Sequence, residues 1–95
     1  MKTRAMRPDL EVTFRKGRAF AAYLYLAPAK GVRVARSSER AHGLVVDYAT
    51  DGEPLGIEII APSRVELEEL NAILRELHAE ELATKDLAPL IAARA

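Results

Sequence analysis

The sequence predicts a small α+β domain in which an antiparallel sheet of four to five strands precedes a long amphipathic helix. Two periodicities carry this prediction. Between residues 10 and 61, apolar and polar residues alternate in several segments, which is the pattern of half-buried strands. From residue 63 to about residue 82, apolar residues recur every three or four positions, as on an amphipathic helix. We expect a single domain, because the chain has 95 residues.

The N-terminal part predicts a hairpin. Leu10, Val12 and Phe14 alternate with polar residues, and residues 16–18 supply a turn. The strand that follows, residues 19–27, has two fairly apolar faces: Phe20, Ala22, Leu24 and Leu26 form one, and Ala21, Tyr23 and Tyr25 form the other. After Pro28 and Gly31 we expect a short third strand over residues 32–36 and then a loop over residues 37–41.

The clearest pattern is a second hairpin, from Leu44 to Ile60. Alternating segments flank a turn centred on residues 51–52, an Asp-Gly pair, and this turn places Val45 opposite Glu58. The expected core face consists of Leu44, Val46, Tyr48, Leu55, Ile57 and Ile59. Asp47 and Glu58 are then expected on the solvent side, where alternating charge is typical of a wet strand face.

The predicted helix begins after Ser63, because Ser63 and Glu66 have the spacing of a capping box. Its apolar stripe is expected to pack on the sheet or on a second copy of the chain, and includes Leu67, Leu70, Ile73, Leu74 and Leu77. A short terminal helix is predicted over residues 86–94, with Asp86 as its cap.

Two segments resemble the DUF2283 family of small bacterial and archaeal proteins. The hairpin sequence GLVVDYATDGEPLGIEII, residues 43–60, is similar to a family pattern of G-V-hydrophobic-V-D-Y, a D-G or E-G turn, and V-G-I-E-I-L. The upstream AFAAYLYL, residues 19–26, is similar to the family's A-D-A-L-Y-I-R-L strand, although the acidic position is apolar here. The resemblance covers about residues 10–62. It implies a sheet domain of prokaryotic origin and transfers no activity, because the family is uncharacterised.

Charge is divided along the chain. Residues 1–42 carry ten Lys and Arg against three Asp and Glu, while residues 43–95 carry four against eleven. Either the basic half offers a ligand-binding face, or the acidic helix and the basic strands attract each other. The chain has no cysteine, which argues against disulfides and thiolate chemistry and favours the cytoplasm. We also expect neither a signal peptide nor a membrane span, because charged residues interrupt the N-terminal segment.

No motif indicates an enzyme, a metal site or a cofactor. His42 and His78 lack metal-ligand spacing, and a metal enzyme would need His42, Asp47 and Glu58 to converge. The leading hypothesis is therefore a noncatalytic interaction module, a homodimer by expectation, whose interface is the helix stripe of Leu67, Leu70, Leu74 and Leu77 or the face of Tyr23 and Tyr25.

The alternative is a small regulatory or antitoxin-like protein that binds nucleic acid or a protein partner through its basic N-terminal face. The two tyrosines could stack on bases while cations in neighbouring segments contact phosphates. The candidate cations are Arg15, Lys16, Arg18, Arg33, Arg36 and Arg40.

Overall fold

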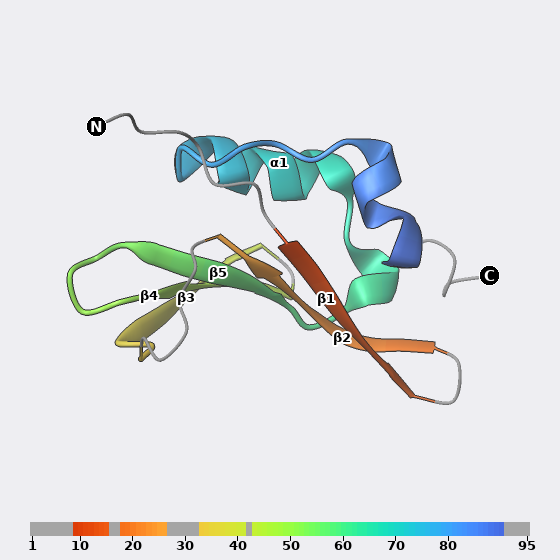
Figure 1. The fold of residues 1–95 in the computed structure, drawn as a ribbon, viewed down its shortest axis with the longest axis horizontal. Coiled ribbons are helices and arrows are strands. Elements are labelled where there is room, and N and C mark those ends of the chain that lie inside the picture. Colours follow the sequence, from red (N-terminus) through yellow and green to blue (C-terminus); the bar gives the residue numbers. More distant parts are fainter. Residues whose placement is uncertain (1–8, 16–17, 27–32, 42, 91–95) are drawn as a thin grey trace.

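The computed structural model describes residues 9–15, 18–26, 33–41 and 43–90. They form a five-stranded antiparallel sheet with the order β1-β2-β5-β4-β3 (Figure 1). The strands are β1 Asp9–Arg15, β2 Arg18–Tyr25, β3 Arg36–Ala41, β4 Leu44–Tyr48 and β5 Pro54–Ile59. The predicted antiparallel sheet is confirmed, and β2 and β5 lie side by side although they are distant in sequence.

The β4–β5 hairpin has the predicted register. Val45 lies opposite Glu58, and Gly52 takes a positive φ of 89° in the turn, a conformation that favours glycine. The six residues assigned to the core face are all buried. The turn itself is longer than the predicted two residues, because the Ala49 amide donates to the Glu53 carbonyl and the pairing shifts between Asp47 and Tyr48. The alternation of apolar residues nevertheless predicted the core face correctly.

The third strand was predicted in the wrong place. Residues 37–41, which were expected as a loop, form β3 together with Arg36 and pair with β4. Their sequence, RSSERA, lacks alternating apolar residues because β3 is an edge strand whose side chains are mostly exposed. Hydrogen bonding to β4 gives this segment its extended structure.

The face predicted for β2 is correct except at Phe20. Ala22, Leu24 and Leu26 are buried, but Phe20 is 53% exposed. The pairing with β1 shifts between Thr13 and Phe14, which leaves Phe20 without an opposite residue on β1. Such a bulge interrupts the alternation of faces, so counting every second residue fails there.

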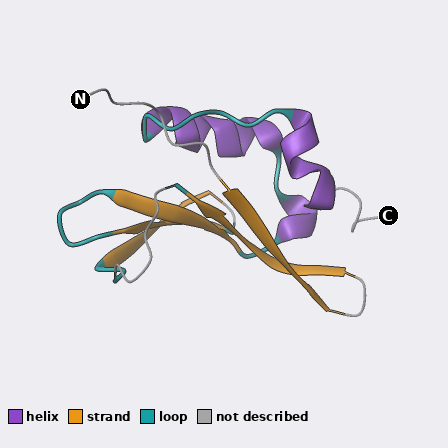
Figure 2. Ribbon diagram, in the orientation of Figure 1, coloured by secondary structure: helices purple, strands orange, loops and turns teal. Residues whose placement is uncertain are grey.

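The helices of the described residues lie on one face of the sheet (Figures 1 and 2). They are a 3₁₀ turn η1 (Pro62–Arg64), the helix α1 (Leu67–Glu76) and a second 3₁₀ turn η2 (Thr84–Leu87). Leu70, Leu74 and Leu90 are fully buried and form one core with the apolar residues of the sheet. The opposite face of the sheet, which we call the outer face, carries no helix in the described part of the chain.

The predicted helix over residues 63–82 is too long at both ends, because α1 spans only ten residues. Ser63 lies in η1, and Glu66, at the N-cap of α1, makes no side-chain capping hydrogen bond. At the other end the amides of His78 and Ala79 donate to carbonyls of the last turn, and His78 has a φ of 61°. This pattern, a Schellman motif, ends the helix at a non-glycine residue, which sequence rules based on glycine do not detect.

The chain after α1 runs back along the helix (Figure 1). The Asn71 side chain bonds both backbone groups of Leu82, at 2.9 and 2.7 Å, and thereby fixes the returning segment. Asp86 does not precede a helix as its cap. It lies inside η2, where its carboxylate accepts a hydrogen bond from the Ala83 amide at 2.7 Å. Residues 88–90, within the predicted terminal helix, are helical and continue η2, and residues 91–94 lie outside the described residues.

Candidate functional site

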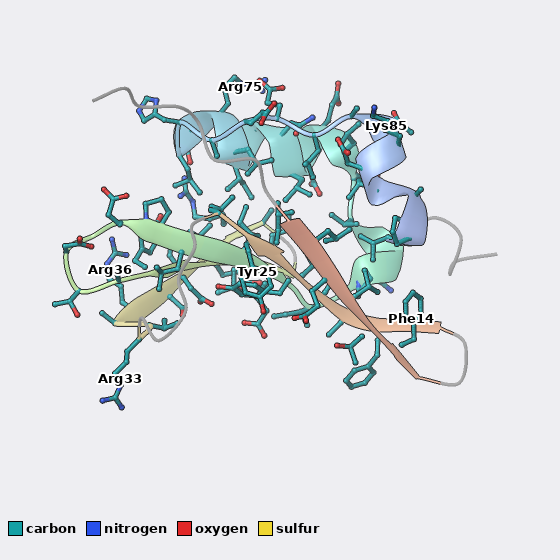
Figure 3. All side chains as sticks on the ribbon, viewed as in Figure 1. Phe14, Tyr25, Arg33, Arg36, Arg75 and Lys85 are labelled. Carbon is teal, nitrogen blue, oxygen red and sulfur yellow. The ribbon has the colours of Figure 1, made fainter. Side chains whose placement is uncertain are left out.

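The outer face of the sheet is organised around two tyrosines of β2. Because side chains alternate along a strand, Tyr23 and Tyr25 project from the face opposite to the buried Ala22 and Leu24. Figure 3 shows Tyr25 on this face. Their ring centroids are 4.7 Å apart with an interplanar angle of 65°, an edge-to-face contact. Tyr25 is 40% exposed, whereas Tyr23 is more covered. The predicted pairing of the two rings on one face is therefore present.

Tyr23 reaches across the sheet to Asp47. Its hydroxyl donates to Oδ2 of Asp47 at 3.0 Å, and the hydroxyl of Ser37 donates to Oδ1 at 2.6 Å. These three side chains come from β2, β4 and β3, so the network spans the sheet. It explains how a carboxylate only 7% exposed is accommodated, since a buried charge needs hydrogen-bond donors.

The expectation that Asp47 and Glu58 both project into solvent is therefore wrong for Asp47. Glu58 is exposed, but Asp47 is covered by Tyr23, which comes from a strand two positions away in the sheet. The order of the strands was not available from the sequence. The alternation alone indicated a solvent-exposed strand face. The long side chain of Tyr23 instead covers Asp47.

Gly56 makes the crossing possible. It lies on β5, between Tyr23 on β2 and Asp47 on β4, and a Cβ added to it would stand 2.5 Å from Cζ and Oη of Tyr23. No real Cβ tolerates such a contact, so the tyrosine ring rests directly on the backbone of β5. A glycine inside a strand is a recognised sign of close approach by another group. This signal could have found the network in the sequence.

Tyr25 has its own acceptor. Its hydroxyl donates to Oε1 of Glu11 on the neighbouring strand β1, at 2.9 Å. This bond is the main reason that the pKa of Tyr25 is raised, while burial comes first for the raised pKa of Tyr23, followed by the hydrogen bond to Asp47 and its negative charge. Both phenols are consequently protonated at neutral pH. They serve as rigid aromatic surfaces with donated hydrogen bonds, not as bases.

Of the cations named from the sequence, those whose side chains the structure describes do not gather around these tyrosines. The Arg36 guanidinium lies 4.1 Å from the ring centroid of Tyr48, a core residue. Arg40 bonds the Tyr48 hydroxyl at 3.4 Å and pairs with Glu76 of α1. Figure 3 shows Arg33 and Arg36 at the end of the sheet formed by β3 and β4. Lys16 lies outside the described residues, and the structure describes only the backbone of Arg15 and Arg18.

The leucine stripe of α1 faces the sheet. Leu70 and Leu74 are fully buried, and Leu67 and Leu77 are partly buried against the same core. Of the two packing arrangements that the sequence left open, the structure has the one within a single chain. Of the two interface candidates, the tyrosine face is the one over which no helix of the described residues packs (Figure 2).

The described residues contain no cluster of side chains that could hold a metal ion. Across the described ranges, no three His, Asp or Glu side chains lie close enough to hold a metal ion. His42 lies outside the described residues, and His78 occupies the end of α1. None of the described helices is long and apolar enough to span a membrane.

A comparison with protein families found a match to the part of the chain that forms most of the sheet. The model described as "Protein of unknown function (DUF2283)" matches residues 21–63. This segment belongs to the DUF2283 family. It runs from β2 into η1 and thus holds Tyr23, Ser37, Asp47 and Gly56, whereas β1 and α1 lie outside the match. No curated protein and no solved structure matches the chain.

Proposed function

We propose that this DUF2283 protein is a noncatalytic interaction module that associates with itself. The observation that carries the proposal is the arrangement of the sheet: one face is covered by helices, while the outer face carries the Tyr23–Tyr25 pair. Both hydroxyls are held by carboxylates, at 3.0 Å for Tyr23 and 2.9 Å for Tyr25. Aromatic rings that are already ordered lose little conformational entropy when a partner covers them, and tyrosine is enriched in protein interfaces.

The chemistry of the outer face supports binding over catalysis. Catalysis by a tyrosine or a carboxylate requires a group that gives or takes a proton near neutral pH. The pKa values of Tyr23 and Tyr25 are raised, away from that range, and both oxygens of Asp47 already accept hydrogen bonds. These groups are organised as a surface.

Nucleic acid binding is the second candidate, and the described residues favour it less. Stacking of bases on Tyr23 and Tyr25 would bring phosphates close to Glu11 and Glu58, and like charges repel. Arg36 and Arg40 are engaged with Tyr48 and with the acidic helix instead. This finding supports the interpretation that basic strands and acidic helix attract each other within one chain.

Sedimentation velocity over a wide range of protein concentrations tests the proposal. We expect a species of twice the monomer mass whose share rises with concentration, as mass action requires. A monomer at every concentration would contradict it. In the same buffer, fluorescence anisotropy with a labelled single-stranded oligonucleotide should show no binding even at low salt, where phosphate contacts are strongest.

A further inference from the structure

We propose that the open edge of β1 is the surface through which two copies associate, by antiparallel pairing of β1 with β1 of the second copy. The inference rests on the proposed function, since it names the surface for self-association. It would join the two sheets into one of ten strands, and the partner is a second copy of this chain.

β1 is the last strand in the order β1-β2-β5-β4-β3, so among the described residues only one of its edges is paired. An unpaired edge presents a row of backbone donors and acceptors that another strand can bond. The apolar residues of β1 are incompletely covered. Leu10 and Val12 are half-buried, and Phe14 is 51% exposed. Pairing with another strand would cover all three.

The other edge strand, β3, is built differently. It is shorter, its residues are mostly polar, and its pairing with β4 shifts between Glu39 and Ala41. Bulges, polar residues and short length are the features by which proteins block edge pairing. The irregularity next to β1 is a residue inserted in β2, at Phe20, so β1 itself remains regular. Of the two edges, β1 is the one suited to accept a strand.

The sequence of β1, DLEVTFR, complements itself when read in the opposite direction. Antiparallel pairing centred on Val12 places every residue of the strand opposite a residue of the second copy. The pairs are Asp9 with Arg15, Leu10 with Phe14, Glu11 with Thr13, and Val12 with Val12. Acidic positions thus meet a basic or a neutral one, and apolar positions meet apolar ones.

Neighbouring registers are worse. Centring the pair on Glu11 would place two carboxylates directly opposite each other, which is destabilising. Centring it on Thr13 would leave Asp9 and Leu10 without a partner in β1. The register on Val12 also keeps both helical layers on one side of the joined sheet and both tyrosine pairs on the other, because opposite residues share a face. Because β1 is paired with β2, this register brings the two Tyr23–Tyr25 pairs into one continuous outer face beside the contact between the copies.

A charge test at Thr13 measures the effect on affinity. Thr13 is exposed and would stand opposite Glu11 of the second copy, twice in each dimer. Thr13→Glu should weaken the dimer about tenfold by repulsion, and Thr13→Lys should tighten it, since each cross-strand charge pair contributes up to about 1 kcal/mol. The two substitutions occupy the same site and control for each other. Circular dichroism and thermal unfolding would verify that both variants fold.

A cysteine test reads the register. The chain has no cysteine, so a single substitution creates a unique thiol. In Val12→Cys the two thiols would face each other, within the reach of a disulfide, and mild oxidation should give a covalent dimer. Leu10→Cys is the matched control on the same strand and face. Its two thiols would lie four residues apart along the strand, about 13 Å, and should not link.

The outcomes separate the inference from the proposed function. A dimer that responds to charge at Thr13 and links through Val12→Cys supports both. A wild-type dimer that is indifferent to both Thr13 variants, or that links equally well through Leu10→Cys, would overturn the β1 pairing and leave self-association standing. A wild-type chain that stays monomeric at every concentration would overturn both.

Discussion

The two faces of the sheet are stabilised by different physics. The helix-covered face is apolar, and its residues, such as Leu24, Ile57 and Leu74, are fully buried. The outer face is held by hydrogen bonds that cross from strand to strand, from Tyr23 to Asp47 and from Tyr25 to Glu11. Burial of apolar area stabilises the first, while the second contributes less free energy and fixes positions. The inner face therefore maintains the fold, and the outer face holds in place the side chains on which the proposed function rests.

The largest expected effect lies on the inner face. Leu74→Ala removes a fully buried side chain between α1 and the sheet, and should lower the free energy of unfolding by about 3 kcal/mol through lost burial and the cavity that remains. Chemical denaturation measures it. Leu67→Ala, on the same helix but only partly buried, is the control and should cost clearly less. Equal losses at the two positions would mean that α1 is not packed as described.

The next effect concerns Gly56. Gly56→Ala would bring a Cβ against the ring of Tyr23, and displacing that ring should cost about 2 kcal/mol, the range for overpacking. In a Tyr23→Ala background the same substitution should cost little, because the ring is gone. Unfolding of the four proteins would show whether the cost depends on Tyr23. If the two substitutions were additive, the ring would not lie on β5.

Alkaline pH should weaken the outer face selectively. The folded-state pKa of Tyr23 is raised above the unfolded value of 10, so its contribution to stability is fully present below pH 10. Above pH 10 the unfolded chain loses the phenolic proton while the folded chain keeps it, and the contribution is lost as pH rises toward the folded pKa. The wild type should therefore lose stability more steeply than Tyr23→Phe. The free energy of unfolding of both proteins can be measured in urea at several pH values from 9 upwards. An equal decrease with pH in the wild type and in Tyr23→Phe would contradict this expectation.

The smallest effect is expected at Tyr25. Its hydroxyl bond to Glu11 is exposed to water, so Tyr25→Phe should leave the free energy of unfolding nearly unchanged. Tyr23→Phe should cost more, since it leaves the buried carboxylate of Asp47 short of a donor. Thermal unfolding of the two variants would give the order, and a larger loss at Tyr25 would reverse the assignment of the two hydroxyls.

The sequence predicted what local patterns determine. The core face follows from alternation, and the register of Val45 with Glu58 is as predicted, although the pairing shifts by one residue between Asp47 and Tyr48, next to the turn. It did not predict the end of α1, because the left-handed residue there is His78. It misassigned β3, which is extended through its pairing with β4 and has little apolar pattern of its own.

Only part of the site could be predicted from the sequence. The pairing of Tyr23 with Tyr25 follows from their spacing alone. The contact with Asp47 depends on β2 lying next to β5, a choice of strand order that no local pattern encodes. Gly56 carried the missing information, since a glycine within a strand marks close approach, but it does not name the residue that approaches. The partners Ser37 and Glu11 could not have been named without the sheet order.

A double-mutant cycle between Tyr23→Phe and Asp47→Ala tests most directly whether the outer face is organised by the bond across β5. The cycle measures the free energy of interaction between the two side chains, apart from their separate effects. We predict that the double variant is more stable than the sum of the single losses requires, by about 1 to 2 kcal/mol, the coupling expected for a hydrogen bond to a charged group. Strict additivity would show that Tyr23 and Asp47 act independently, and would contradict the account of a surface fixed by this bond.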